Sequence, residues 1–312
     1  MTLWAVITLV FVLPRLLPGD PLASLSDPSS GNFLYDPTAR AKIAAYYGLN
    51  KPLVNQYFAY LAGLAHAQLG WSISQNTPVT TIIARRLPWT LLLMVTALAL
   101  SSVISFLTGV TAAWHRGDRI DRALIVALSA ARTIPDYAVA SLLLVALAVV
   151  VPVFPLAGAK TAFASYSSPF AAIGDVGRHM VLPVVALTAG LAGNKFLTVR
   201  NTVISTLGED YMLLARAKGL PRRLLKYRHS GRNALLPFVT AVGIQTGFAV
   251  GGALFVETVF SYPGMGTLMN AAVTARDYPL LQGSFLVLAT VVLVVNLVVE
   301  LAYGRLDPRV RV

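Results

Sequence analysis

Few side chains in this 312-residue sequence could carry out catalysis or hold a metal, and they lie far apart. There is no Cys, and the four His residues fall in different loops or helix ends, so their spacing suggests no metal site. They are His66, His115, His179 and His229. The G-x-x-x-x-G-K-[ST], H-E-x-x-H and G-x-S-x-G motifs are also missing. We therefore expect no catalytic residue, no metal and no cofactor bound by this chain, and an embedded enzyme is unsupported.

The most informative polar segment is a basic loop with the signature of a short helix. Glu209 and Asp210 are acidic residues that favour a helix N-terminus, and Lys218 and Gly219 are typical of a C-terminus. Gly219 can adopt the left-handed conformation of a helix cap, and Pro221 can begin a second, basic helix. The pattern predicts a helix, a tight turn and a second helix. From spacing alone, an ordinary solvated basic loop is an equal alternative.

Three charged residues interrupt otherwise apolar segments. Arg132 and Asp136 flank Pro135, and a charge at membrane depth is costly unless it is paired or hydrated. Two interpretations stay open: a neutralising pair one helical turn apart, or a polar lining of a translocation cavity in a helix that Pro135 bends. Lys195 is expected near a helix end, where its long side chain can reach the membrane surface.

Glycine recurs every fourth residue on one face of a predicted helix, at Gly243, Gly247 and Gly251. This spacing lets helices approach backbone to backbone in a membrane. The three residues either pack statically within this chain, which we favour, or form a surface that moves against a partner subunit near a gate.

The amino-acid composition of the chain indicates that membrane helices position these residues. Hydrophobic residues make up 56% of the chain and charged residues only 12%, about half the fraction usual for soluble domains. This composition excludes a soluble globule, a disordered protein and a fibrous repeat. Five segments reach the ~20 residues that a spanning helix needs, and a sixth candidate is shorter. The segments are 89–114, 123–151, 180–199, 233–256 and 278–299, and the shorter one is 1–17.

The distribution of positive charge predicts the orientation. The net charge is +12, and more than half of the Lys and Arg residues lie in 114–122, 200–232 and 305–312. Positive residues concentrate on the cytoplasmic side, so six helices with both termini in the cytoplasm are expected. We assign the basic residues to lipid headgroups and cytoplasmic loops rather than to nucleic acid. The segment 20–88 is then external, with two short amphipathic helices broken near Gly48 and Pro52.

Several segments resemble one branch of the ABC importer permeases, the dipeptide, oligopeptide and nickel branch. The sequence ARAKGL at 215–220, followed by RHSGRNALLP at 228–237, is similar to the cytoplasmic signature of that family. Further similar segments are LLPGDP at 16–21, YYGLNKPLVNQYFAYL at 46–61, FVETVFSYPGMG at 255–266 and LDPRVR at 306–311. Two positions depart from the family pattern: Leu213 replaces a glutamate of other branches, and Gln68 replaces an aspartate.

The resemblance implies an all-α membrane protein with the type I ABC importer (MetI-like) permease fold, six transmembrane helices and a large external loop after helix 1. It implies a bacterial cell membrane location and transport of peptides or a similar small solute. The implied partners are a second homologous permease in a heterodimer, two ATP-binding subunits that hold ATP and Mg, and an extracellular or periplasmic binding protein. The expected division is 1–19 first helix, 20–88 external loop, 89–304 five-helix core with a coupling loop at 200–233, and 305–312 cytoplasmic tail.

The resemblance also assigns roles to residues. A helix that couples the chain to the ATPase would use Asp210, Tyr211, Leu214, Ala215, Arg216, Ala217, Lys218, Gly219, Leu220 and Arg232. Glu257, Pro263, Gly264 and Gly266 match the external end of the fifth helix and a re-entrant turn. Candidates for the pathway or gate are Arg132, Pro135, Asp136, Gly243, Gly247, Gly251 and Glu257. The alternatives are a stand-alone secondary transporter or channel, which would work without ATPases, and a membrane enzyme or scaffold.

Overall fold

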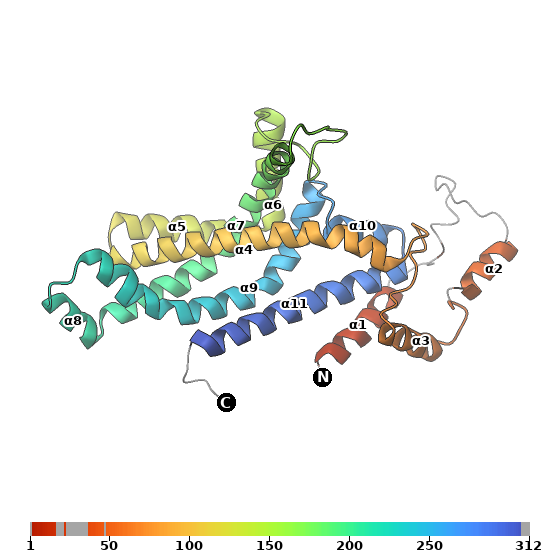
Figure 1. Cartoon of the computed structure of the whole chain (residues 1–312), viewed down its shortest axis with the longest axis horizontal. Coiled ribbons are helices and arrows are strands. Elements are labelled where there is room, and N and C mark those ends of the chain that lie inside the picture. Colours follow the sequence, from red (N-terminus) through yellow and green to blue (C-terminus); the bar gives the residue numbers. More distant parts are fainter. Residues whose placement is uncertain (1, 17–21, 23–36, 47, 307–312) are drawn as a thin grey trace. The chain divides into compact units, whose positions relative to one another are not determined.

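The computed structural model describes residues 2–16, 22, 37–46 and 48–306, and these residues form helices with no β-strand. A single isolated bridge joins Trp71 and Pro78. The chain divides into two compact units, residues 1–89 with 263–291 and residues 90–262 with 292–312. Figure 1 shows the helices of both units coloured along the sequence.

The first unit contains the amino-terminal helices and part of the carboxyl-terminal region. Its elements are α1 (Thr2–Leu16), α2 (Pro37–Tyr46), α3 (Leu53–Ala65), the start of α4 (Val79–Trp114), α10 (Met265–Thr274) and the start of α11 (Tyr278–Leu306). The predicted break between α2 and α3 is confirmed. Gly48 has a φ of +68°, and Pro52 immediately precedes α3.

A buried carboxylate holds the loop before α4 against the start of α11. One oxygen of Asp277 accepts hydrogen bonds from Ser72 Oγ at 2.5 Å and from the backbone N and Oγ of Ser74 at 2.9 and 2.8 Å. The other oxygen accepts from the backbone N of Leu280 at 3.1 Å, in the first turn of α11. Asp277 therefore acts as both a helix cap and a loop anchor.

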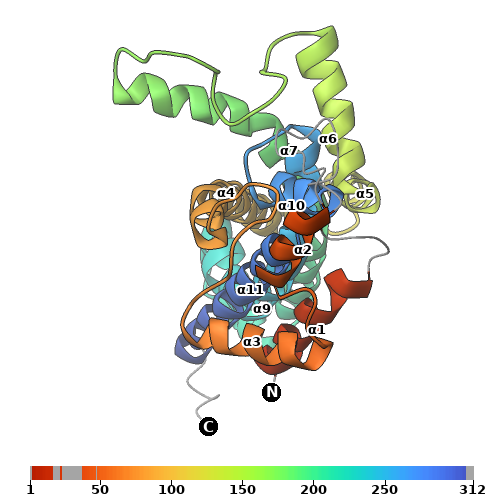
Figure 2. The ribbon, with the colours of Figure 1, turned by 90° about the vertical axis from the view of Figure 1, so that its right-hand side faces the viewer.

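The second unit is a bundle built around α7. Its elements are the rest of α4, α5 (Arg119–Thr133), α6 (Asp136–Leu144), η2 (Val145–Val150), α7 (Pro169–Leu207), α8 (Asp210–Ala217), η3 (Leu224–Gly231), α9 (Arg232–Val259) and the rest of α11. Helices α5, α6 and α9 pack on α7, and Figure 2 shows α6 and the start of α7 projecting from this bundle. Gly109 allows α4 to approach α7 closely, because a Cβ there would lie 2.8 Å from Val199 Cβ.

The described helices include four that are long and apolar enough to cross a membrane. They are Val79–Trp114, Pro169–Leu207, Leu224–Val259 and Tyr278–Val299. A fifth span results if the bent pair α5 and α6 is counted as one, and Trp4–Leu16 forms a shorter apolar helix.

Two expectations about these spans need correction. The segment 123–151 is not one continuous helix, because α5 and α6 meet at 97°. The break lies at Ile134 and Pro135: Ile134 is extended, as the residue before a proline prefers, and Pro135 has no N–H for a continuing helix. Lys195 does not reach the membrane surface. This residue of α7 is fully buried, and its Nζ donates to Ser101 Oγ at 2.6 Å and to Ser102 Oγ at 3.3 Å.

Candidate functional site

The predicted helix and turn in the basic loop are present. Helix α8 runs over Asp210–Ala217, and Gly219 has a φ of +71°. The N–H of Gly219 donates to the carbonyl of Arg216 at 2.9 Å, and the N–H of Leu220 donates to the carbonyl of Ala215 at 3.4 Å. This pair of bonds is the Schellman arrangement, in which a left-handed residue closes the end of a helix. The chain therefore leaves α8 in a fixed direction.

One face of α8 anchors it to the bundle, and the other is exposed. Met212 and Ala215 are buried against Leu225 of η3, and partly buried hydrophobic residues pack around them. These are Trp114, Leu207 and Leu220. On the opposite side, Leu213 and Leu214 are 67% and 57% exposed. Exposed apolar side chains on a well-anchored helix are typical of a surface that contacts a partner protein.

The segment after the turn is helical from Arg222, but most of it has π-helical hydrogen bonding. Lys226, in this segment, donates from Nζ to Thr111 Oγ1 of α4 at 3.1 Å. Asn233, at the start of α9, donates from its side-chain amide to the Tyr211 hydroxyl of α8. The loop is thus tied to α4, α8 and α9, and neither Thr111 nor Asn233 was singled out from the sequence, because these contacts are non-local.

A basic cavity lies beside α8. Its volume is about 460 Å³, and its lining includes the side chains of Arg216, Arg222 and His115. His115 Nδ1 lies 3.0 Å from the carbonyl of Thr111. Among the residues that the structure describes, neither Arg216 nor Arg222 makes an ion pair. The predicted coupling residue Arg232 is exposed and lies at the first position of α9.

Asp136 lies within the helix bundle and forms no ion pair with Arg132. Helix α5 ends at Thr133, so the one-turn spacing needed for a pair is lost. A Cβ added to Gly190 of α7 or Gly252 of α9 would collide with the Asp136 carboxylate. Asp136 therefore lies where α6, α7 and α9 meet, in a space that these two glycines provide. The sequence did not identify the two glycines, since nothing local connects them to residue 136.

The three glycines of α9 have different surroundings. A Cβ at Gly243 would lie 2.6 Å from Val299 of α11, so this residue packs within the chain. A Cβ at Gly247 or Gly251 would meet no atom within 4 Å. Large exposed apolar side chains lie on the same helix, including Phe248 at 70% exposure. The glycines thus form one contact inside the chain and leave an open face beside it.

The end of α9 is buried and turns sharply. Glu257 and Tyr262 are both fully buried, and the N–H of Tyr262 donates to the carbonyl of Glu257 at 2.8 Å. Burial, and secondarily the Glu257 carboxylate, raise the pKa of Tyr262. In the first unit, Pro263 and Gly264 precede α10, and Gly266 lies in its first turn. The described residues contain no group of three or more His, Asp or Glu side chains that could hold a metal.

Comparison with known proteins identifies the family. Residues 105–312 match the family described as "binding-protein-dependent transport system inner membrane component". The dipeptide transport system permease protein DppB of Escherichia coli K12 is 34% identical over 320 residues, covering 97% of this chain and 93% of that protein. The di/tripeptide transport system permease protein DppB of Pseudomonas aeruginosa is 34% identical over 324 residues, covering 99% and 95%. The glutathione transport system permease protein GsiC of Escherichia coli O6:H1 is 32% identical over 310 residues, covering 99% and 95%.

Each alignment with one of these relatives covers nearly the whole length of both chains. The family match includes α8 and its turn. Proteins of this family are multi-pass inner membrane permeases, and ATP hydrolysis and solute capture belong to other subunits of the transport system. The chain therefore belongs to the family of binding-protein-dependent transport system inner membrane components and is a permease subunit of an ABC importer.

Proposed function

We propose that this permease forms half of the translocation pathway of a peptide importer, for dipeptides, oligopeptides or a similar small solute. The named relatives are permeases for dipeptides, di/tripeptides and glutathione, and each aligns with nearly the whole chain. The observation that carries the mechanism is α8 itself. It is anchored to the bundle by Met212 and Ala215, and it presents Leu213 and Leu214 outward.

The proposed topology has six transmembrane helices, with both termini in the cytoplasm of a bacterial cell. The external loop spans residues 20–88, the five-helix core 89–304, and the cytoplasmic tail 305–312. Support comes from the apolar lengths of the described helices and from the positive charges in and beside α8 and η3. In this arrangement α8 lies on the cytoplasmic side, where ATPase subunits are.

The proposed coupling is mechanical. Two ATPase subunits, which hold ATP and Mg, dock on α8 and move it as a rigid body together with η3. A second homologous permease completes the pathway, and a binding protein delivers the solute from outside. ATP can shift the equilibrium between inward-facing and outward-facing states only through a difference in affinity for the two states. The turn at Gly219 must therefore stay closed while α8 is moved, and its two backbone hydrogen bonds supply that rigidity.

The proposed pathway lies along α9. The open face at Gly247 and Gly251 would contact the second permease, and Asp136 would contribute a polar group near the kink between α5 and α6. Arg132 and Pro135 lie at the same kink, and Glu257 lies at the far end of α9. The lone carboxylate at this helix junction suits a hydrated cavity better than a lipid-facing surface.

The experiment that tests the function is uptake into proteoliposomes. The permease is reconstituted with its second permease and ATPases, a labelled dipeptide and the binding protein are added outside, and ATP is enclosed. ATP-dependent accumulation is expected only when all subunits are present. Accumulation by this chain alone would contradict the proposal and would support a stand-alone transporter. Uptake of other solutes but of no peptide would contradict the assigned substrate class.

A further inference from the structure

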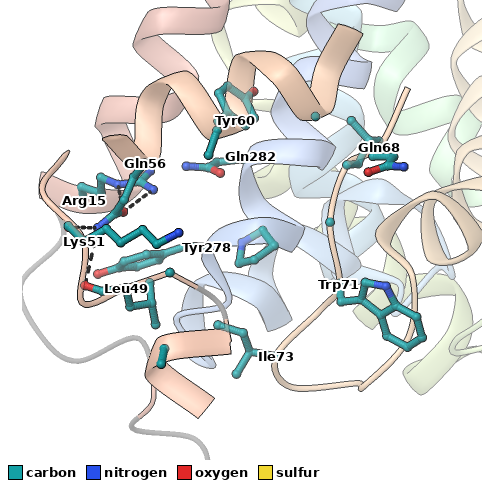
Figure 3. A pocket seen from close by; sticks show the side chains of 17 residues that line it. Arg15, Leu49, Lys51, Gln56, Tyr60, Gln68, Trp71, Ile73, Tyr278 and Gln282 are labelled. Atoms are coloured by element: carbon teal, nitrogen blue, oxygen red, sulfur yellow. Dashed lines mark hydrogen bonds between the residues drawn. The ribbon is translucent and has the colours of Figure 1, made fainter. Parts of the chain in front are cut away.

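A cationic pocket in the first unit has no role in the function described above. Its volume is about 410 Å³, within the range of small-molecule sites. It is lined by the end of α1, by one face of α3, by the loop before α4 and by the start of α11. Figure 3 shows Arg15, Gln56 and Lys51 together at one end, and Gln68 and Trp71 at the other.

The side-chain amide of Gln56 joins the Arg15 guanidinium to the backbone of the loop that carries Lys51. Gln56 Oε1 accepts from Arg15 Nη2 at 2.9 Å and from Nε at 3.3 Å. Gln56 Nε2 donates to the carbonyls of Lys51 at 2.9 Å and of Leu49 at 3.5 Å. The guanidinium also donates to the carbonyl of Phe11 and stacks over its ring. Arg15 thus uses three of its five N–H donors, and two remain.

Neither cation is neutralised by the part of the chain that the structure describes. Arg15 and Lys51 make no ion pair there, and the described residues that line the pocket include no Asp or Glu. Holding two like charges together costs free energy unless an anion joins them. The described lining of the pocket therefore offers two cations to an anionic group.

Tyr60 of α3 also forms part of the pocket wall. The hydroxyl of Tyr60 is buried and has no hydrogen-bond partner, and a buried polar group usually has one. Burial raises the pKa of Tyr60 to about 12, so the phenol keeps its proton and adds no negative charge to the pocket wall. The side chains of the two cations supply donors only, which suits the acceptor oxygens of a carboxylate.

The rest of the lining suits a peptide. The side chain of Gln68 makes no hydrogen bond within the described chain, and its amide can both donate to and accept from a peptide bond. Trp71 is 46% exposed and offers an aromatic surface. The apolar residues Val54 and Phe58 of α3 lie on the face opposite the pocket stripe, so that face suits lipid while the pocket faces water.

We propose that this pocket binds the C-terminal end of a peptide, with the carboxylate held at Arg15 and Lys51 and the chain running toward Gln68 and Trp71. The proposal rests on the proposed function, because it takes peptides as the solute. It makes the permease itself selective for a free C-terminus. Without an acidic residue in the described lining, the pocket does not select for a free N-terminus.

The test is equilibrium binding of alanyl-alanine to the full chain in phosphatidylcholine nanodiscs. The free dipeptide and its N-acetyl form should bind equally, and the C-terminal amide about tenfold more weakly, as expected for loss of a charge-assisted bond. Lys51→Gln should weaken binding of the free acid but not of the amide. Lys42→Gln, an exposed lysine of α2 outside the pocket, is the matched control and should change nothing.

Four results would overturn the proposal. The dipeptide amide could bind as tightly as the free dipeptide, or N-acetylation of the dipeptide could abolish its binding. Glycerol phosphate, or phosphatidylglycerol in the nanodisc, could displace the dipeptide, which would make this a lipid headgroup site. Finally, the wild-type chain could bind no dipeptide. If the complete importer still accumulates dipeptide in that last case, only this inference fails; if it does not, the proposed function fails as well.

Discussion

The left-handed turn at Gly219 offers the sharpest test of mechanical coupling, because a substitution there changes backbone strain and little else. A Cβ added at Gly219 would meet no atom within 4 Å, so the first atom of a substituted side chain has room. The cost is conformational. A non-glycine residue in the left-handed region loses about 1–3 kcal/mol, and a β-branched side chain lies toward the upper end.

The turn can avoid this strain only by opening. Opening breaks the bonds from Gly219 to Arg216 and from Leu220 to Ala215, each worth a net ~1 kcal/mol. The two costs are similar, so the closed turn loses most of its advantage over open forms. A difference of about 2 kcal/mol changes a population ratio by roughly 30-fold. In the proposed mechanism α8 would then move without carrying η3 and α9 with it.

The assay measures dipeptide uptake and ATP hydrolysis in the same proteoliposomes. For Gly219→Val we expect normal complex yield and continued ATP hydrolysis, with the ratio of uptake to hydrolysis lowered about tenfold. Gly219→Asn should be milder, because asparagine tolerates the left-handed region. The matched control is Gly117→Val, since Gly117 has a φ of +87° and equally open surroundings between α4 and α5. A wild-type ratio for Gly219→Val, or the same loss for Gly117→Val, would refute the coupling role of this turn.

Three other predictions test separate parts of the structure. Asp277→Ala should lower the free energy of unfolding by about 2–4 kcal/mol, because it leaves the buried donors of two serines without an acceptor. Thermal unfolding in detergent measures this loss, and an unchanged melting temperature would contradict the anchor role. Gly190→Ala should lower the thermal stability, and adding Asp136→Ala should restore part of it in a double-mutant cycle. If the stability changes of the two single mutants simply add in the double mutant, the contact between these residues is excluded. Leu214→Glu should abolish co-purification of the ATPases without altering thermal stability. The control Leu156→Glu, at a similarly exposed position, should leave co-purification intact. Retention of the ATPases by Leu214→Glu would argue against docking on α8.

The parts of the site that the sequence predicts are those governed by local rules. Acidic residues at the start of α8 and a glycine two residues beyond its end fix a short helix with a left-handed cap, and both are present. The break at Gly48 and Pro52 follows from the same kind of rule. Each of these features depends on backbone preferences of neighbouring residues, so no tertiary information is needed.

The features that the sequence does not predict depend on contacts between distant residues. Asp136 was expected either to pair with Arg132 or to line a cavity, and the position opposite Gly190 and Gly252 arises only when α7 and α9 are packed. Lys195 was misplaced for a different reason. The apolar segment ends near Val199, but α7 continues to Leu207, so a residue near the apolar boundary lies far from the helix end.

Helix α9 connects the two groups of candidate site residues within the second unit. It follows η3 without interruption at Gly231, and its 28 residues extend about 42 Å. One end is attached to α8 through Asn233, and the Gly252 position beside Asp136 lies 19 residues further along the chain. A rigid displacement of α8 would therefore change how α9 packs against α6 and α7 at the carboxylate. This arrangement explains how a subunit with no nucleotide-binding motif of its own could respond, deep in its helix bundle, to ATP bound by a partner.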